Sequence, residues 1–245
     1  MLGRSFYIVI IGAILVVIVG WQYAMTITPK EETVAERAEI LAPGWGQLDF
    51  VPPAAGTYEL PKIKKAASGE ILLDDGAPAE LSDYIGDKAV LLSFIYTSCS
   101  DVNGCPLATF VLHSMSKALK EVPALSDDIR LVTLSFDPER DTPEAMRSYG
   151  ADFVNDSAVE WVFATTESEK QLTPILDEYG QFVFKTVEQV GDTEKVNFAH
   201  VLKSYLIDRQ GYIRNIYSVS YLHPNIIIND FKTILSEEGY PQQSG

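Results

Sequence analysis

The two cysteines of this chain, Cys99 and Cys105, are separated by five residues. Two thiolates that face each other select soft metal ions, Cu(I) above all, with Zn(II) as the common competitor. The alternatives are a structural disulfide and a redox-active pair, since a compartment outside the cytoplasm permits disulfides. A disulfide that closes so short a loop constrains little of the unfolded chain, so the spacing favours a functional site.

The positions of Cys105 and of one histidine support this interpretation. Cys105 lies at the expected start of a helix, where free backbone amides favour an anion, so we expect its thiol to ionise easily. His200 directly precedes an apolar run from Val201 to Ile207 and is the candidate for a third ligand. His113 is expected on the exposed face of the helix after Cys105. His223, next to a proline, is expected in a loop or at a helix start.

Continuous apolar runs and helical periodicity predict the elements that position these side chains. The run from Ala89 to Tyr96 is typical of a central strand that is covered on both faces. A helix with one apolar face follows Cys105. The stretches Ile71 to Leu73 and Leu81 to Ile85 are expected to form a preliminary hairpin. The later elements are strands at 129–136 and 161–164, a helix that opens at Thr142, a helix that stops at Gly180, hairpin strands at 201–207 and 212–217, and a last helix from Pro224 to Gly239.

This order of elements predicts an α/β fold, a thioredoxin-like sandwich with a mixed central sheet. The loop from Cys99 to Cys105 follows the first central strand, at the carboxyl end where ligands collect in open α/β sheets. In such a fold the segment that carries His200 lies beside the cysteine loop. The sequence therefore predicts that two thiols and one imidazole converge in the fold and form a trigonal metal site.

The first 57 residues differ in composition from the rest of the chain. Residues 1–25 contain an uncharged apolar run from Phe6 to Ala24, which spans roughly 28 Å as a helix, close to the thickness of a bilayer core. No small-residue cleavage pattern follows it, so we expect an uncleaved N-terminal membrane anchor with the remainder on the extracytoplasmic side, the periplasm of a bacterium. Residues 26–57 are expected to form a linker and residues 58–240 the thioredoxin-like domain.

The composition of the 245-residue chain excludes some classes of protein. Hydrophobic residues make up 47% and charged residues 22%, which is ordinary for a globular domain with a sizeable core. The formal net charge of -15 argues against nucleic acid as a partner, because a phosphate backbone requires clustered Lys and Arg. The charge suits a positively charged protein partner.

Three segments together resemble the SCO/SenC family. They are Thr97-Ser98-Cys99 with Cys105-Pro106 after a buried strand, the run Asp137-Pro138-Glu139-Arg140-Asp141-Thr142-Pro143, and His200 before a strand. The Asp-Pro-Glu-Arg-Asp-Thr-Pro run is the most specific of the three. The resemblance covers about Tyr58 to Leu235, nearly all of the expected folded part.

The resemblance implies a copper-binding assembly factor for the dinuclear copper centre of cytochrome c oxidase. The family's two thiolate ligands match Cys99 and Cys105, and its histidine ligand matches His200, so these residues would hold one Cu(I) or Cu(II) ion. Asp137 would lie next to the site, as a supporting group or a weak ligand to Cu(II). The family usually places three residues between its cysteines, whereas this chain has five. We expect this longer loop to affect which partner protein the site fits more than which metal it binds.

The run from Asp137 to Thr142 also has a purely structural interpretation. Asp137 and Pro138 can end a strand, Arg140 can pair with a carboxylate, and Thr142 can cap the next helix. None of these roles requires a metal.

Two functions follow from these residues. The first is a membrane-anchored metallochaperone that delivers copper to a cuproenzyme, most of all to the copper-bearing subunit of cytochrome c oxidase, and depends on a thiol reductant. The alternative is a thiol–disulfide oxidoreductase that keeps the acceptor's cysteines reduced, with Cys99 and Cys105 as its redox pair. The spacing is not C-x-x-C, and His200 stands where thioredoxin-type reductases carry a proline, so the first function is favoured over enzymatic activity.

Overall fold

The core of the molecule is a set of three parallel strands whose residues are almost all buried. The computed structural model describes residues 40–190 and 193–239. Strand β4 (Ala89–Ile95) is buried along its whole length and pairs in parallel with β5 (Ile129–Ser135), which is equally buried. Strand β6 (Glu160–Thr165) pairs in parallel with β5 on its other side. The continuous apolar runs predicted as central strands are thus confirmed.

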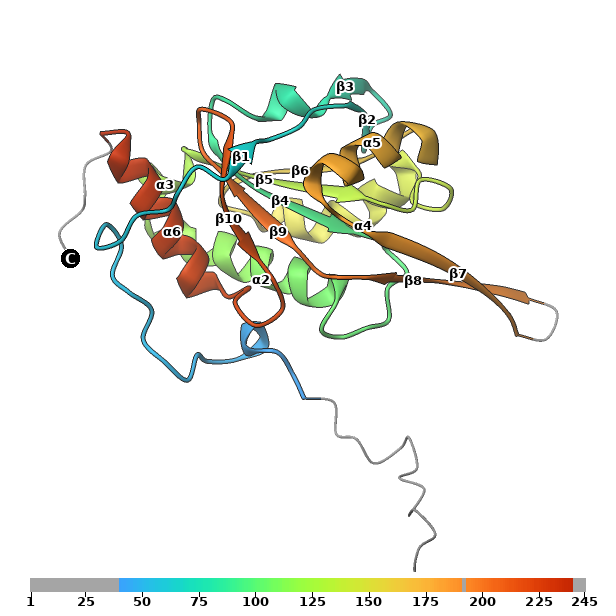
Figure 1. Cartoon of the computed structure of the whole chain (residues 1–245), viewed down its shortest axis with the longest axis horizontal. Helices are drawn as coiled ribbons and strands as arrows, with labels where there is room; N and C mark the ends of the chain where they lie inside the picture. The colour runs from blue at the N-terminus through green and yellow to red at the C-terminus, as the bar shows by residue number, and fades with distance from the viewer. Residues whose placement is uncertain (1–39, 191–192, 240–245) are drawn as a thin grey trace, which may run out of the picture. The chain divides into compact units, whose positions relative to one another are not determined.

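Antiparallel strands extend this parallel group on both sides into one mixed sheet of eight strands. Their order is β1-β10-β9-β4-β5-β6-β2-β3 (Figure 1). The outer strands are β1 (Lys64–Lys65), β2 (Glu70–Leu73), β3 (Pro78–Glu80), β9 (Ser204–Ile207) and β10 (Tyr212–Tyr217). The predicted α/β class with a mixed central sheet is confirmed.

Helices cover both faces of the sheet. The α-helices are α2 (Cys105–Ala118), α3 (Pro123–Ser126), α4 (Pro143–Asn155), α5 (Glu169–Tyr179) and α6 (Pro224–Glu237). Strands β4, β5 and β6 are neighbours in chain order, so the crossover helices α2 and α4 are expected on the same face. The bond of 2.7 Å between Thr109 on α2 and Tyr149 on α4 agrees with this. Helix α6 packs on α2. Helix α5 lies on the opposite face of the sheet, where the ring of Tyr179 contacts that of Phe94.

Helix boundaries follow the signals in the sequence. The Thr142 side chain caps α4 by accepting a hydrogen bond from the amide of Ala145, and proline follows at the first helical position. Helix α5 ends at Gly180, whose φ of 60° lies in the left-handed region that glycine adopts without strain. Both predicted boundaries are therefore confirmed.

The hairpins of the structure differ from the sequence prediction in two places. The preliminary hairpin pairs β2 with β3, and the predicted second strand at 81–85 is instead the 3₁₀ helix η3 (Leu81–Tyr84). The second is an omitted hairpin, in which β7 (Val183–Val190) and β8 (Thr193–His200) pair antiparallel as a separate two-stranded sheet. In Figure 1 this hairpin extends away from the main sheet. His200 is the last residue of β8, and β9 begins only at Ser204.

Residues 41–57, which the sequence assigned to a linker, belong to the same compact unit as the domain. They contain the 3₁₀ helix η2 (Pro43–Trp45), whose Trp45 ring stacks on Phe110 of α2 at 4.5 Å between ring centroids. The expected anchor at 1–25 lies outside the described residues. Within 40–190 and 193–239, no helix is long and apolar enough to cross a bilayer.

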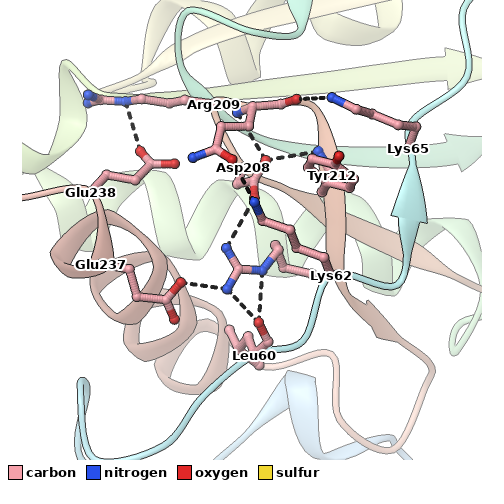
Figure 2. A network of polar contacts seen from close by, with 10 residues as sticks. Leu60, Lys62, Lys65, Asp208, Arg209, Tyr212, Glu237 and Glu238 are labelled. Carbon is pink, nitrogen blue, oxygen red and sulfur yellow. Dashed lines mark hydrogen bonds and ion pairs between the residues drawn. The ribbon is translucent and has the colours of Figure 1, made fainter.

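A buried arginine fastens the segment that leads into β1. Arg214 on β10 donates to the Leu60 carbonyl, to Asp208 at 3.0 Å and to Glu237 of α6 at 2.5 Å, and Figure 2 shows this network. The Asp208 side chain is fully buried and also accepts from the amides of Gln210 and Tyr212. The guanidinium therefore neutralises a buried carboxylate and joins three parts of the chain.

We expect Arg214→Met to lower the free energy of unfolding by roughly 3 kcal/mol, because it leaves the Asp208 carboxylate buried without its counter-charge. Denaturant unfolding of the full chain measures the effect. Lys62→Ala is the control, since its bond to Gln210 is exposed, and it should change the free energy by less than about 0.5 kcal/mol. Equal, small effects of the two variants would contradict the assignment.

Candidate metal centre

Three elements bring two sulfurs and one imidazole together at the carboxyl end of β4. Cys99 lies in the loop that follows this strand, Cys105 is the first residue of α2, and His200 ends β8. One ligand atom from each lies within 4.8 Å of the other two. The convergence that the sequence predicted for these residues is therefore present in the structure.

Both cysteines, which lie in the described part of the chain, are free thiols with different exposure. Cys105 is 1% exposed, and its sulfur accepts a hydrogen bond from the Tyr96 amide at 3.5 Å. Cys99 is partly exposed at the surface. Cys99 is therefore the sulfur that another molecule can reach first.

The pair shares its ionisation unequally. A hydrogen bond from the Cys105 thiol, helped by His200, lowers the pKa of Cys99 to about 3. The same bond to the Cys99 thiolate, together with burial, raises the pKa of Cys105. The expectation that Cys105 ionises easily at the helix start is therefore wrong, because its neighbour already holds the negative charge.

An aromatic cluster holds the imidazole of His200. Its ring centroid lies 4.7 Å from that of Phe136 and 6.3 Å from that of Tyr96, and Phe198 packs on both of these rings. The Nε2 atom faces Cys105 Sγ at 3.8 Å. The buried Nδ1 atom has no hydrogen-bond partner among the residues that the structure describes. One nitrogen is thus directed at the sulfurs, as a ligand must be.

The donor set fits copper. Two sulfurs and one imidazole nitrogen form a soft, trigonal set that suits Cu(I). The thiolate on Cys99 is the form that binds a metal, and Cys105 must release its proton when it becomes a ligand.

Comparison with known proteins gives a consistent result. The model of the SCO1/SenC family matches residues 66–236. The chain belongs to this family. An SCO2-like protein of Rickettsia prowazekii is 27% identical over 167 residues, which cover 67% of this chain and 76% of that protein.

Two solved structures of SCO proteins share the fold. Copper-bound ScoI of Arabidopsis thaliana superimposes with a TM-score of 0.59 at 20% identity, covering 71% of this chain and 99% of that one. BsSco, described as a member of the Sco family of cytochrome c oxidase assembly proteins and as having a disulfide switch, has a TM-score of 0.52 at 23% identity. That match covers 69% of this chain and 92% of BsSco.

The acidic run of this SCO1/SenC chain contains a residue whose role the sequence analysis missed. Asp141 is buried and accepts hydrogen bonds from the Thr97 amide at 3.0 Å and from the hydroxyls of Thr97 and Ser135 at 2.5 Å. It thereby ties the start of the cysteine loop to the end of β5. Its place in the Asp-Pro-Glu-Arg-Asp-Thr-Pro run was the available signal, but that run does not reveal which strand end each carboxylate serves.

Asp137 does not converge on the sulfurs with His200. Its carboxylate is buried and bonds to Arg140 at 2.6 Å, which confirms the predicted pairing of Arg140 with an acidic side chain. Burial raises the pKa of Asp137, although Arg140 opposes the shift. The Arg140 guanidinium lies 5.6 Å from the ring centroid of Phe198. Asp137 is therefore connected to His200 indirectly, through Arg140 and the aromatic cluster. Its role beside a metal stays a prediction.

The two other histidines have partners away from the sulfurs. His113 bonds to Asp156 at 3.2 Å and is partly rather than fully exposed. His223 caps α6 by accepting from the Asn225 amide, as expected for a residue at a helix start.

Two cavities include Cys99 in their lining. One, of about 330 Å³, is lined mainly by aromatic side chains and includes Trp45, Tyr96, Tyr149 and Phe153. The other, of about 380 Å³, includes Tyr96, Phe198 and His200. Cys99 is therefore accessible beside apolar surface, whereas Cys105 stays buried.

We expect the alkylation rate of Cys99 to change little between pH 5 and 8, because its thiolate is already formed in that range. In Cys105→Ala, loss of the donated hydrogen bond raises the pKa of Cys99, so the rate should increase with pH, by up to about tenfold per unit where the thiol is protonated. Mass spectrometry after timed labelling measures both rates. A tenfold rise per unit in the parent would contradict the lowered pKa.

Proposed function

We propose that this chain is a membrane-anchored copper carrier that holds one copper ion, as Cu(I) or Cu(II), through Cys99, Cys105 and His200. The observation that carries the proposal is the convergence of three soft donors from three separate elements within 4.8 Å. Membership of the SCO1/SenC family and the copper-bound relative of the same fold support it. The proposed recipient is a cuproenzyme, and the leading candidate is the copper-bearing subunit of cytochrome c oxidase.

The unequal exposure of the donors suggests an order of transfer. An acceptor ligand can replace Cys99 first, because this residue is partly exposed and lines two cavities. Cys105 and His200 then hold the ion from the buried side until further acceptor ligands replace them. A thiol reductant must keep both cysteines reduced before loading, since a disulfide offers no thiolate.

The location of the protein is part of the proposal. The apolar run at 1–25 would fix the chain to a membrane, with the folded domain on the extracytoplasmic, periplasmic side. The net charge of -15 suits a basic patch on the acceptor and no nucleic acid.

Anaerobic titration of the reduced full chain with Cu(I) should give one equivalent bound. Cys99→Ser, Cys105→Ser and His200→Ala should each weaken binding by more than the roughly 10- to 100-fold that loss of an outer partner costs. Competition with a chromophoric chelator measures the affinity. His113→Ala is the matched control, because His113 is committed to Asp156, and it should bind like the parent. A parent chain that binds no copper would exclude the carrier.

A thiol–disulfide oxidoreductase is the second candidate, and the asymmetric ionisation of the thiols favours it. The Cys99 thiolate would attack a disulfide of the acceptor, forming one S–S bond and expelling the acceptor's other sulfur as a thiolate. Cys105 would lose its proton and attack Cys99, which forms the intramolecular disulfide and releases the reduced acceptor. An external thiol would then regenerate the pair.

His200→Ala separates the two functions. If reduction is the main activity, this variant should reduce a model disulfide peptide at nearly the parent's rate, whereas Cys99→Ser should be inactive, because the nucleophile is lost. If copper carriage is the main activity, His200→Ala should lose copper affinity, and the parent should reduce the peptide slowly. Thiol release in a stopped-flow assay, run beside the copper titration, distinguishes these outcomes.

A further inference from the structure

The segment Ala42–Gly46, here called the strap, contacts the loop between the two cysteines. The Ala42 amide donates to Asn103 Oδ1 at 2.8 Å. The indole Nε1 of Trp45 donates to the Val102 carbonyl at 3.2 Å. Both acceptors belong to the five residues that separate the cysteines, so the strap holds the middle of this loop from outside.

The strap is itself fixed to the helices behind the loop. Gly44 is buried so closely that a Cβ atom there would lie 2.4 Å from the Leu222 carbonyl and 2.8 Å from Val111. The Trp45 ring stacks on Phe110, and His223 Nε2 lies 3.2 Å from the Gly46 carbonyl. The strap is therefore wedged between the first half of α2 and the start of α6, and it can act as a rigid support.

The cysteine loop has internal contacts that the strap complements. The Asn103 amide donates to Asp101 Oδ1 at 3.0 Å, and the Gly104 amide donates to the Asp101 carbonyl at 2.9 Å. These bonds form a local turn, but they do not attach the turn to the rest of the domain. The bonds from Ala42 and Trp45 attach the turn to the strap, and the Trp45 side chain also lines the cavity that includes Cys99 and Cys105.

We propose that the strap sets the position of the cysteine loop and thereby governs how fast copper leaves the site, with Trp45 and Asn103 as positioning residues. The inference rests on the proposed copper-carrier function. A five-residue loop has more conformations to lose on ordering than a shorter one. Contacts that order it in the free protein preorganise both sulfurs and slow the dissociation of their common ligand.

The test measures the rate at which Cu(I) passes from the loaded full chain to an excess of a chromophoric chelator. Trp45→Phe removes the bond to Val102 while an aromatic ring still stacks on Phe110, and Asn103→Ala removes the acceptor of the Ala42 amide. Each should accelerate release roughly 3- to 10-fold, the change expected for the loss of one hydrogen bond. Asn229→Ala is the matched control, because it removes a bond from residue 229 to the Pro53 carbonyl, away from the loop, and it should release copper at the parent's rate.

Hydrogen exchange of the copper-free chain provides a readout that does not depend on metal. Amides in residues 101–104 should exchange faster in Trp45→Phe and Asn103→Ala than in the parent or in Asn229→Ala. A parent that binds copper, with both strap variants releasing it at the parent's rate, overturns this inference and leaves the carrier intact. A parent that binds no copper overturns the copper-carrier function and, with it, the role of the strap in copper release. Unchanged hydrogen exchange of residues 101–104 in both variants would show that the strap does not hold the loop.

Discussion

The register of β4 against β5 is the constraint on which the site depends. The two parallel strands end together, with Ile95 opposite Ser135, and the next residues, Tyr96 and Phe136, both contact the ring of His200. A slip of one residue would direct every side chain of β4 to the other face of the sheet and would remove the aromatic pair from the imidazole. Asp141 supports the same alignment, since it accepts hydrogen bonds from Thr97, just after β4, and from Ser135, the last residue of β5.

A second constraint is electrostatic. Two thiols this close in a mostly buried site cannot both ionise without cost, so the pair keeps one proton and one negative charge. The lowered pKa of the partly exposed Cys99 and the raised pKa of the buried Cys105 assign the charge to Cys99 and the proton to Cys105. A copper ion that bound both sulfurs would displace this proton and replace the hydrogen bond, so loading is coupled to proton release. The same asymmetry suits thiol exchange, which is why one pair of residues supports both candidate functions.

Sequence patterns predicted the parts of this architecture that depend on local or strongly periodic signals. The runs of β4 and β5, the Thr142 cap and the Gly180 stop each have a physical cause within a few residues. The hairpin β7–β8 was missed because it stands apart from the main sheet, and Phe184 is largely exposed. A ribbon of this kind lacks the buried apolar run by which a strand is detected. The attachment of residues 41–57 was missed for a related reason. The prolines and glycines of this segment predict a linker, whereas its contacts with the domain are made by single residues such as Trp45, which no periodic pattern reveals.

The hairpin β7–β8 divides the site into two parts, with the sulfurs on one part of the fold and the imidazole on the other. The sulfurs belong to the buried core through β4 and α2, whereas the imidazole ends a ribbon outside the main sheet. Near the site this ribbon is held by Lys185, which bonds to Glu139 at 2.5 Å, and by Phe198, which packs on the rings of Tyr96 and Phe136. A surface ion pair of this kind contributes little, so the aromatic packing is what keeps His200 beside the sulfurs. The core therefore fixes the two sulfurs and aromatic packing fixes the imidazole, so the geometry of the three donors depends on two separate parts of the fold.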